Sequence, residues 1–144
     1  MKVIDLIGRR TDVYSVEPDT SVHTVAQYLR EKQVRAVGVV NPSGRLVGVV
    51  SQSDISDQVA AENKCPAWMK ASDIMTRELV TVTPDRPLDE CLRLMEQHSI
   101  YHLLVVDEAG GYRGMLSVTD LLRVIASDEK QRADLLEALM FPQR

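Results

Sequence analysis

The stretch Gly114-Met-Leu-Ser117-Val-Thr119-Asp120 joins a short apolar run to a cluster of polar side chains. We interpret it as the end of a buried strand that leads into the first turn of a helix. At such a junction the free backbone N–H groups and the helix dipole favour an anion. Ser117 and Thr119 add hydroxyls, and the carboxylate of Asp120 can accept hydrogen bonds from two sugar hydroxyls. The stretch therefore predicts a nucleotide site.

A second copy of this stretch, Gly48-Val-Val-Ser51-Gln-Ser53-Asp54, lies 66 residues earlier in the chain. When 66 is added to each position from 16 to 55, the sequence aligns with itself without a gap. The motif Val-x-Pro-Asp then corresponds at positions 16–19 and 82–85. The chain therefore contains an internal repeat, and the repeat defines its organisation.

Each copy has the pattern of a strand, a helix, two further strands and a closing helix. Short β-rich runs at 13–16 and 79–82 end in Pro-Asp turns, and the apolar residues that follow recur at helical spacing. Two apolar runs joined by a glycine-containing turn then predict a hairpin. A Ser-x-x-Asp segment opens each closing helix, which we expect at 53–62 and at 119–126.

The repeat divides the chain into a first motif with its lead-in (1–62), a linker (63–72), a second motif (73–126) and a C-terminal amphipathic helix (127–144). Within the linker, we expect Trp68 to act as a packing anchor. The C-terminal helix carries an apolar stripe that must pack on the body of the protein or on a partner chain. The stripe consists of Leu135, Leu136, Leu139 and Met140.

The composition of the chain limits the kinds of partner that we expect. The net charge is −4 and no long basic run occurs, which argues against nucleic acid. No apolar run approaches the roughly 20 residues of a transmembrane helix, and the first residues are not typical of a signal peptide. We therefore expect a cytoplasmic protein without a membrane partner. Two cysteines and three scattered histidines give neither a disulfide framework nor metal-ligand spacing, so we expect no metal and no required cofactor.

The order, spacing and duplication of these motifs resemble a tandem pair of cystathionine-β-synthase (CBS) domains. Besides the two Gly-x-x-Ser-x-[Ser/Thr]-Asp stretches, the segment Asp73-Ile-Met-Thr76-Arg is typical of the lead-in to a second CBS motif. The resemblance covers about 4–126. It implies an α+β fold, an α/β-type sandwich, in which two β-α-β-β-α motifs pack through their sheets about a pseudo-twofold axis. Two such pairs commonly form a disc-shaped homodimer.

The resemblance also implies two clefts, each with ribose and phosphate contacts from one motif and much of the base pocket from the other. In the cleft of the second motif, Asp120 would bind the ribose hydroxyls, and Ser117 and Thr119 would face the ribose or a phosphate. Alternatively, Asp120 only caps the closing helix. The remaining contacts to the base and phosphates would come from Met115, Val34, Tyr14, Arg35, His102 and Tyr101. Arg9 and Arg10 could reach a phosphate or simply solvate the entry to the fold.

The cleft of the first motif would use Asp54 with Ser51 and Ser53 for the ribose and phosphates. The family often carries an arginine at the position of Ser53 and a basic residue at the position of Ala36. These differences weaken the phosphate contacts expected in this cleft. Its other contacts would come from Val49, Ile100, Val80 and Thr76.

We predict a regulatory module that binds an adenine nucleotide, with AMP ranked before ADP, ATP and NAD(H). An S-adenosyl ligand would make the same ribose contact and stays open. We expect no enzyme, because no P-loop, dinucleotide-binding glycine motif or nucleophile elbow occurs and Asp54 and Asp120 belong to different clefts. Two alternatives remain: a ligand-free structural or protein-interaction dimer that acts through its last helix, and a small enzyme that acts on the bound nucleotide. We also expect a downstream protein target as a partner of the module.

Overall fold

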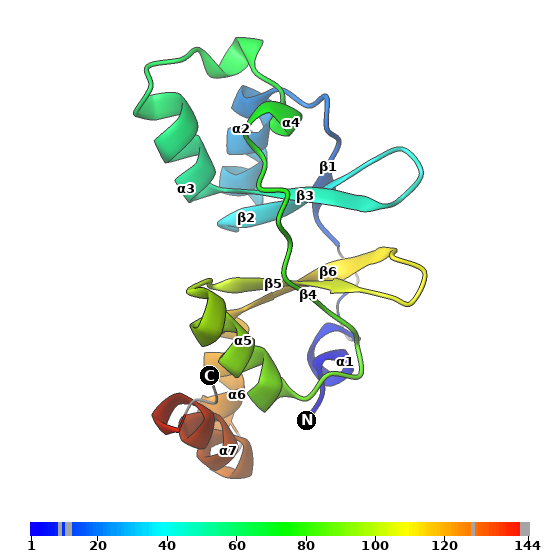
Figure 1. The fold of residues 1–144 in the computed structure, drawn as a ribbon, viewed down its shortest axis with the longest axis vertical. Coiled ribbons are helices and arrows are strands. Elements are labelled where there is room, and N and C mark those ends of the chain that lie inside the picture. The colour runs from blue at the N-terminus through cyan, green and yellow to red at the C-terminus, as the bar shows by residue number, and fades with distance from the viewer. Residues whose placement is uncertain (9, 11–12, 128, 142–144) are drawn as a thin grey trace. The chain divides into compact units, whose positions relative to one another are not determined.

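A computed structural model describes residues 1–8, 10, 13–127 and 129–141 of the chain. The chain forms two compact units (Figure 1). The first-motif unit comprises Tyr14–Leu79 and Gly110–Tyr112, and the second-motif unit comprises Met1–Val13, Val80–Ala109 and Arg113–Arg144. The predicted α+β class and the two strand-helix-strand-strand-helix motifs are confirmed.

In the first-motif unit a three-stranded sheet has the order β1-β2-β3, in which β2 pairs parallel to β1 and antiparallel to β3. The expected closing helix is observed as a short α-helix followed by π-helical turns. The elements are β1 (Ser15–Val16), α2 (Val22–Lys32), β2 (Ala36–Val40), β3 (Leu46–Ser51), α3 (Gln52–Ile55), the π-helical η1 (Ser56–Ala60), the 3₁₀-helical η2 (Pro66–Trp68) and α4 (Ala71–Ile74).

The second-motif unit repeats this arrangement with a sheet of order β4-β5-β6, in which β4 and β5 are parallel. The residues that cap the C-terminal ends of α5 and α2 are Ser99 and Gln33, two non-glycine residues with left-handed φ values of 53° and 55° that stand 66 positions apart. The elements are α1 (Val3–Ile7), β4 (Thr81–Val82), α5 (Leu88–His98), β5 (His102–Val106), β6 (Tyr112–Ser117), α6 (Val118–Ser127) and α7 (Glu129–Met140).

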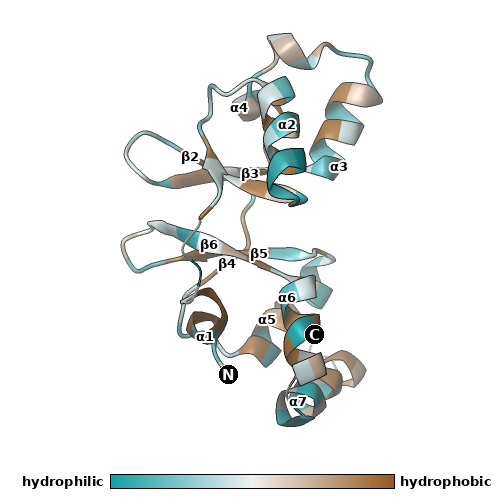
Figure 2. Ribbon diagram, turned by 180° about the vertical axis from the view of Figure 1, so that it is seen from behind, coloured by the Kyte–Doolittle hydropathy of each residue, from teal (hydrophilic) through white to brown (hydrophobic). Residues whose placement is uncertain are grey.

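Each lead-in helix packs in the unit of the other motif. The strongly apolar α1 (Figure 2) buries Val3 and Ile7 in the core of the second-motif unit, where the Val3 N–H donates to the Arg86 carbonyl at 2.9 Å. Correspondingly, α4 buries Ala71 and Ile74 in the core of the first-motif unit. In the chain each lead-in helix precedes its own motif, but in the structure it packs in the core of the unit formed by the other motif.

The C-terminal helix α7 packs against α5 and α6. Its buried face includes Leu135 and Ala138, both fully buried in the core of this unit. The rest of the expected apolar stripe lies outside that face: Leu136, Leu139 and Met140 are 43%, 44% and 70% exposed.

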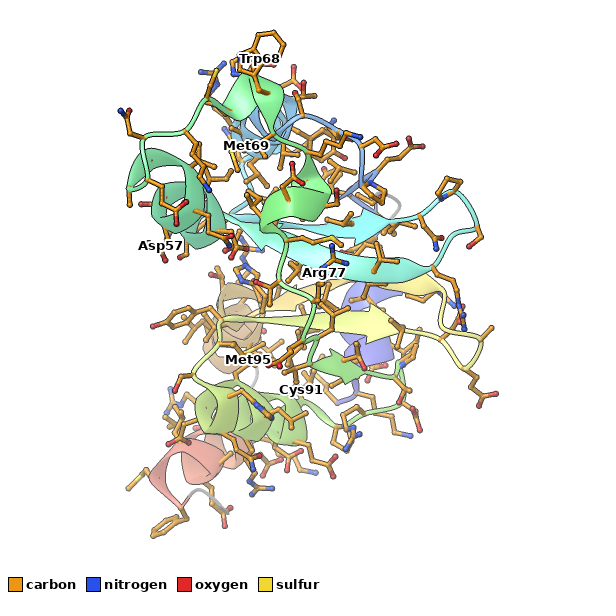
Figure 3. The ribbon with its side chains drawn as sticks, turned by 45° about the horizontal axis from the view of Figure 1, so that its top comes forward. Asp57, Trp68, Met69, Arg77, Cys91 and Met95 are labelled. Carbon is orange, nitrogen blue, oxygen red and sulfur yellow. The ribbon has the colours of Figure 1, made fainter. Side chains whose placement is uncertain are left out.

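The linker is anchored by a different residue than expected. The side chain of Trp68 is 87% exposed and projects away from the ribbon of η2 (Figure 3), so the prediction that it acts as a packing anchor is wrong. Its neighbour Met69 is partly buried against the first-motif core, and the Val22 N–H donates to its carbonyl at 2.8 Å. A large apolar side chain such as that of Trp68 favours burial, but the backbone hydrogen bond to Val22 holds the segment where Met69 contacts the core instead.

Candidate functional site

Asp120 lies in the first turn of α6, directly after β6, and Ser117 holds it in place. The Ser117 N–H and hydroxyl donate to Asp120 Oδ2 at 2.8 and 3.0 Å, and the Asp120 N–H donates back to the Ser117 hydroxyl at 3.2 Å. This reciprocal capping satisfies backbone donors at the start of the helix. Asp120 therefore does cap α6, and a ligand role would come in addition.

Arg10 is the third partner of this carboxylate. Its Nη2 lies 2.8 Å from Asp120 Oδ2, and its Nη1 donates to the carbonyl of Met115 on β6. Arg123 is more distant, with Nη1 at 3.7 Å from Asp120 Oδ1. Burial alone would raise the pKa of Asp120, but the hydrogen bonds from Ser117 and the ion pair with Arg10 outweigh it and hold the pKa below its ordinary value. The carboxylate is thus ionised and oriented at neutral pH.

The first motif holds Asp54 in the same way. The Ser51 N–H and hydroxyl donate to Asp54 Oδ2 at 2.9 and 3.1 Å. Here the third donor is the hydroxyl of Thr76, 3.2 Å from Asp54 Oδ1. Thr76 also pairs through its backbone with Val49 on β3, in both directions, at 3.1 and 2.9 Å. Each carboxylate therefore receives one donor from the segment that follows a lead-in helix.

We call Asp120, Ser117, Arg10 and Met115 the Asp120 half-site, and Asp54, Ser51, Thr76 and Val49 the Asp54 half-site. Except for Arg10, all of these residues were assigned to clefts from the sequence, and the structure brings each set together within one unit. Arg10 was considered only as a residue that reaches a phosphate or solvates the entry to the fold. Its position 66 residues before Thr76 was the signal that could have identified it, but it lies outside the segment that aligns without a gap.

The other predicted residues of the second-motif unit surround β5 and the start of α6. Thr119 and Tyr101 are exposed and His102 is half-buried. The carbonyl of Tyr101 accepts from the Val118 N–H at 2.9 Å, which links β5 to the β6–α6 junction. Val80 and Ile100 are partly buried against the core of this unit.

The remaining predicted residues belong to the first-motif unit. Tyr14 packs edge-on against Tyr28 with ring centroids 6.1 Å apart, and Val34 is partly buried against the core. Ser53 and Arg35 are exposed, and the Arg35 carbonyl accepts from Gln52 N–H at 3.0 Å. Tyr14, Val34 and Arg35 were assigned to the cleft of Asp120, and Val80 and Ile100 to that of Asp54, so each group belongs to the unit opposite its carboxylate. That these residues complete the clefts of the two carboxylates stays a prediction.

Across the part of the chain that the structure describes, no group of three His, Cys, Asp or Glu side chains is placed to hold a metal ion. Over the same residues, none of the helices combines the length and apolar character needed to cross a membrane.

A motif repeated twice, each copy with a capped carboxylate at a strand-to-helix junction, defines the class of protein. The chain belongs to the CBS domain family, whose model matches residues 3–61 and 71–127. The sequence-based assignment to this family is confirmed.

Curated relatives contain the same region within longer chains. The chain is 38% identical over 113 residues to a homoserine O-acetyltransferase from Methanococcoides burtonii, a match that covers 78% of this chain and 22% of that protein. It is 30% identical over 115 residues to an uncharacterized protein from Methanopyrus kandleri, covering 80% of this chain and 59% of that protein. The chain therefore spans less than two thirds of the length of either relative.

Solved structures share the fold over most of the chain. A CBS-domain protein from Burkholderia ambifaria superposes with a TM-score of 0.82 at 26% identity and covers 90% of this chain and 96% of its own. A CBS domain protein from Pyrobaculum aerophilum, complexed with AMP, has a TM-score of 0.82 at 24% identity, with coverages of 96% and 100%. The CBS domain pair of protein MJ0100, in complex with 5′-methylthioadenosine and S-adenosyl-L-methionine, has a TM-score of 0.77 at 25% identity, with coverages of 86% and 98%.

Proposed function

We propose that this protein is a regulatory module that binds an adenine nucleotide through the Asp120 and Asp54 half-sites, with AMP as the first ligand to test. The observation that carries the proposal is the state of Asp120, which is 14% exposed in its side chain, ionised and oriented by Ser117. A carboxylate held in this way can accept hydrogen bonds from the two vicinal hydroxyls of a ribose.

The ligands of similar structures support the same chemistry. One CBS domain protein of this fold is complexed with AMP, and a CBS domain pair is complexed with 5′-methylthioadenosine and S-adenosyl-L-methionine. All three ligands carry adenine and ribose but differ beyond the ribose. The ribose half-site is therefore the common element, and the group attached to the ribose decides between an adenine nucleotide and an S-adenosyl ligand.

In this proposal the resemblance to CBS pairs assigns the contacts beyond the ribose. Regulation requires that the ligand bind one arrangement of the protein more tightly than another, because equal affinity shifts no equilibrium. For the Asp120 half-site, the base and phosphate contacts would come from Met115, Val34, Tyr14, Arg35, His102, Tyr101, Ser117 and Thr119. For the Asp54 half-site they would come from Val49, Ile100, Val80, Thr76, Ser51 and Ser53.

Isothermal titration with AMP, ADP, ATP, NADH and S-adenosylmethionine tests the proposal on the wild type and on Asp120→Asn. The asparagine keeps a carbonyl oxygen for the Ser117 cap but removes the charge and one acceptor. We expect the affinity of the Asp120 half-site to fall by about ten- to a hundredfold, since a charge-assisted hydrogen bond contributes about 1.5–3 kcal/mol. The melting temperature should fall only slightly, because the Ser117 cap keeps an acceptor and the lost ion pair with Arg10 is partly exposed.

Asp5→Asn is the matched control, because Asp5 Oδ2 accepts from the Lys2 N–H at 2.8 Å as a helix cap in the same unit. It makes the same change of charge away from the half-site and should leave affinity unchanged. If Asp120→Asn lowers stability but not affinity, Asp120 serves only as a cap. If none of the ligands binds at millimolar concentration, the proposal is wrong.

A second candidate function is a protein-interaction homodimer that acts through α7. The observation that favours it is the exposed apolar end of this helix, where Met140 and Phe141 are 70% and 68% exposed next to Leu136 and Leu139. Deleting the helix would remove Leu135 from the core, so a surface substitution is the better test. Leu139→Glu should convert a dimer to a monomer in light scattering and spare nucleotide binding. An unchanged mass would remove α7 from the interface.

A further inference from the structure

Arg10 is held at the Asp120 half-site by two anchors from the body of its unit. One guanidinium nitrogen pairs with Asp120 Oδ2 at 2.8 Å, and the other donates to the Met115 carbonyl. The guanidinium thus bridges the carboxylate expected to bind ribose and the backbone of the strand expected to lie beside the base. The Arg10 side chain remains 34% exposed, so it can leave this position without opening the core.

We infer that Arg10 is a displaceable occupant of the Asp120 half-site that makes this half-site select ligands carrying a phosphate over the corresponding nucleoside. The inference rests on the proposed function and names the chemical class that one of its sites prefers. It assigns Arg10 a role in specificity rather than in the solvation of the chain entry.

The donors around Asp120 show why the ligand and Arg10 compete. Oδ2 already accepts from the Ser117 N–H and hydroxyl and pairs with Arg10. Near the other oxygen, Oδ1, lies Arg123 Nη1 at 3.7 Å, which is beyond hydrogen-bond distance. A ribose diol that uses both carboxylate oxygens must therefore take the place of the guanidinium at Oδ2.

The fate of the released guanidinium decides which ligand binds well. Arginine stays charged at any physiological pH, and its planar donors match the oxygens of a phosphate. A nucleoside would break the ion pair with Asp120 and offer Arg10 no new anion. A nucleotide brings its own phosphate, so the ion pair with Asp120 is exchanged for one with the ligand.

The Asp54 half-site provides an internal contrast. There the third donor is the neutral hydroxyl of Thr76, 3.2 Å from Asp54 Oδ1. A ribose that displaces this hydroxyl breaks a hydrogen bond but separates no charges. The preference for a phosphate that depends on the third donor to the carboxylate should therefore be confined to the Asp120 half-site.

The test compares AMP with adenosine by isothermal titration in an Asp54→Asn background, which isolates the Asp120 half-site. For Arg10→Ala, we expect adenosine to bind about two- to fivefold more tightly, as for removal of a partly exposed ion pair. AMP should bind about tenfold more weakly, since a guanidinium–phosphate contact is lost. The preference for AMP over adenosine should therefore fall by about twenty- to fiftyfold. Arg10→Lys, which keeps the charge, should restore part of the preference.

Arg123→Ala is the matched control, because it removes the same charge from a side chain that is 77% exposed and outside hydrogen-bond distance of Asp120. It should leave the ratio of the two affinities nearly unchanged. A ratio that Arg10→Ala does not change, or that Arg123→Ala lowers equally, overturns the inference and leaves the proposed function intact. If neither AMP nor adenosine binds the wild type, both the inference about Arg10 and the proposed function are wrong. Circular dichroism melts of each variant establish that the comparison is made between folded proteins.

Discussion

In the Asp54 half-site the third donor to the carboxylate is the hydroxyl of Thr76, whereas in the Asp120 half-site it is the guanidinium of Arg10. The two donors stand 66 residues apart, the offset that relates the repeats, and each follows a lead-in helix. The serine caps are the same within a few tenths of an ångström. The repeat has therefore kept the scaffold of the carboxylate while the charge beside it differs.

This comparison shows how a duplicated motif can separate structural from chemical roles. Ser51 and Ser117 serve the helix start in both copies and fix the carboxylate in either case. The position that differs lies on the segment after the lead-in helix and takes no part in the hydrogen bonds between the serine and the aspartate. A charged donor in one copy and a neutral donor in the other would allow the two half-sites to prefer ligands of different charge.

The largest expected effect concerns the helices that deliver these donors. Ile7 on α1 is 6% exposed and Ile74 on α4 is 1% exposed, each in the core of the unit that its lead-in joins. Ile7→Ala and Ile74→Ala should each lower the free energy of unfolding by about 2–5 kcal/mol, measured by urea denaturation. Ile4→Ala, at a side chain 40% exposed, is the control and should change it by less than about 0.5 kcal/mol. Equal small losses at all three positions would show that the lead-ins do not anchor the units.

A smaller effect separates the two equivalent glycines before the carboxylates. A Cβ at Gly48 would lie 2.5 Å from Met75 Sδ, whereas Gly114 has open space but a φ of 139° that L-residues rarely adopt. Gly48→Ala should cost about 1–3 kcal/mol through overpacking, and Gly114→Ala about 1 kcal/mol through backbone strain. In a double-mutant cycle Met75→Ala should relieve the first cost. Full additivity of Gly48→Ala and Met75→Ala would contradict the steric explanation.

Much of the fold and the anchors of both half-sites could be predicted from the sequence because they are local. Helical spacing, Pro-Asp turns and the Ser-x-x-Asp caps each extend over a few residues, and the repeat confirms one copy by the other. Ser117 and Asp120 are three residues apart, so their hydrogen bonds follow from the start of the helix. Cys91 shares the buried apolar face of α5, and burial raises the pKa of its thiol to about 12.

The features that could not be predicted depend on contacts far apart in the chain. Arg10 contacts Met115 across 105 residues, and no local pattern specifies that pairing. The packing of each lead-in helix in the unit of the other motif is also a long-range feature. The contacts of α1 and α4 with those cores are not specified by a local sequence pattern. Trp68 and the exposed residues of the α7 stripe were expected to pack but lie at the surface. An apolar side chain favours burial, but the path of the backbone decides whether that side chain faces the core.

The smallest expected effect is the pH dependence that the charged donor adds to one half-site only. The pKa of Asp120 lies below its ordinary value of 3.8, so its ion pair with Arg10 stabilises the fold above that pH and is lost as pH falls through the lower folded-state pKa. Arg10→Ala should therefore lower the free energy of unfolding by about 1 kcal/mol or less at pH 7, since Arg10 is one-third exposed. The difference from the wild type should shrink below about pH 4 and in 1 M salt. Thr76→Ala removes a neutral donor, so its effect should not change with salt. A salt-independent loss for Arg10→Ala would mean that its contact with Met115, rather than its charge, stabilises the half-site.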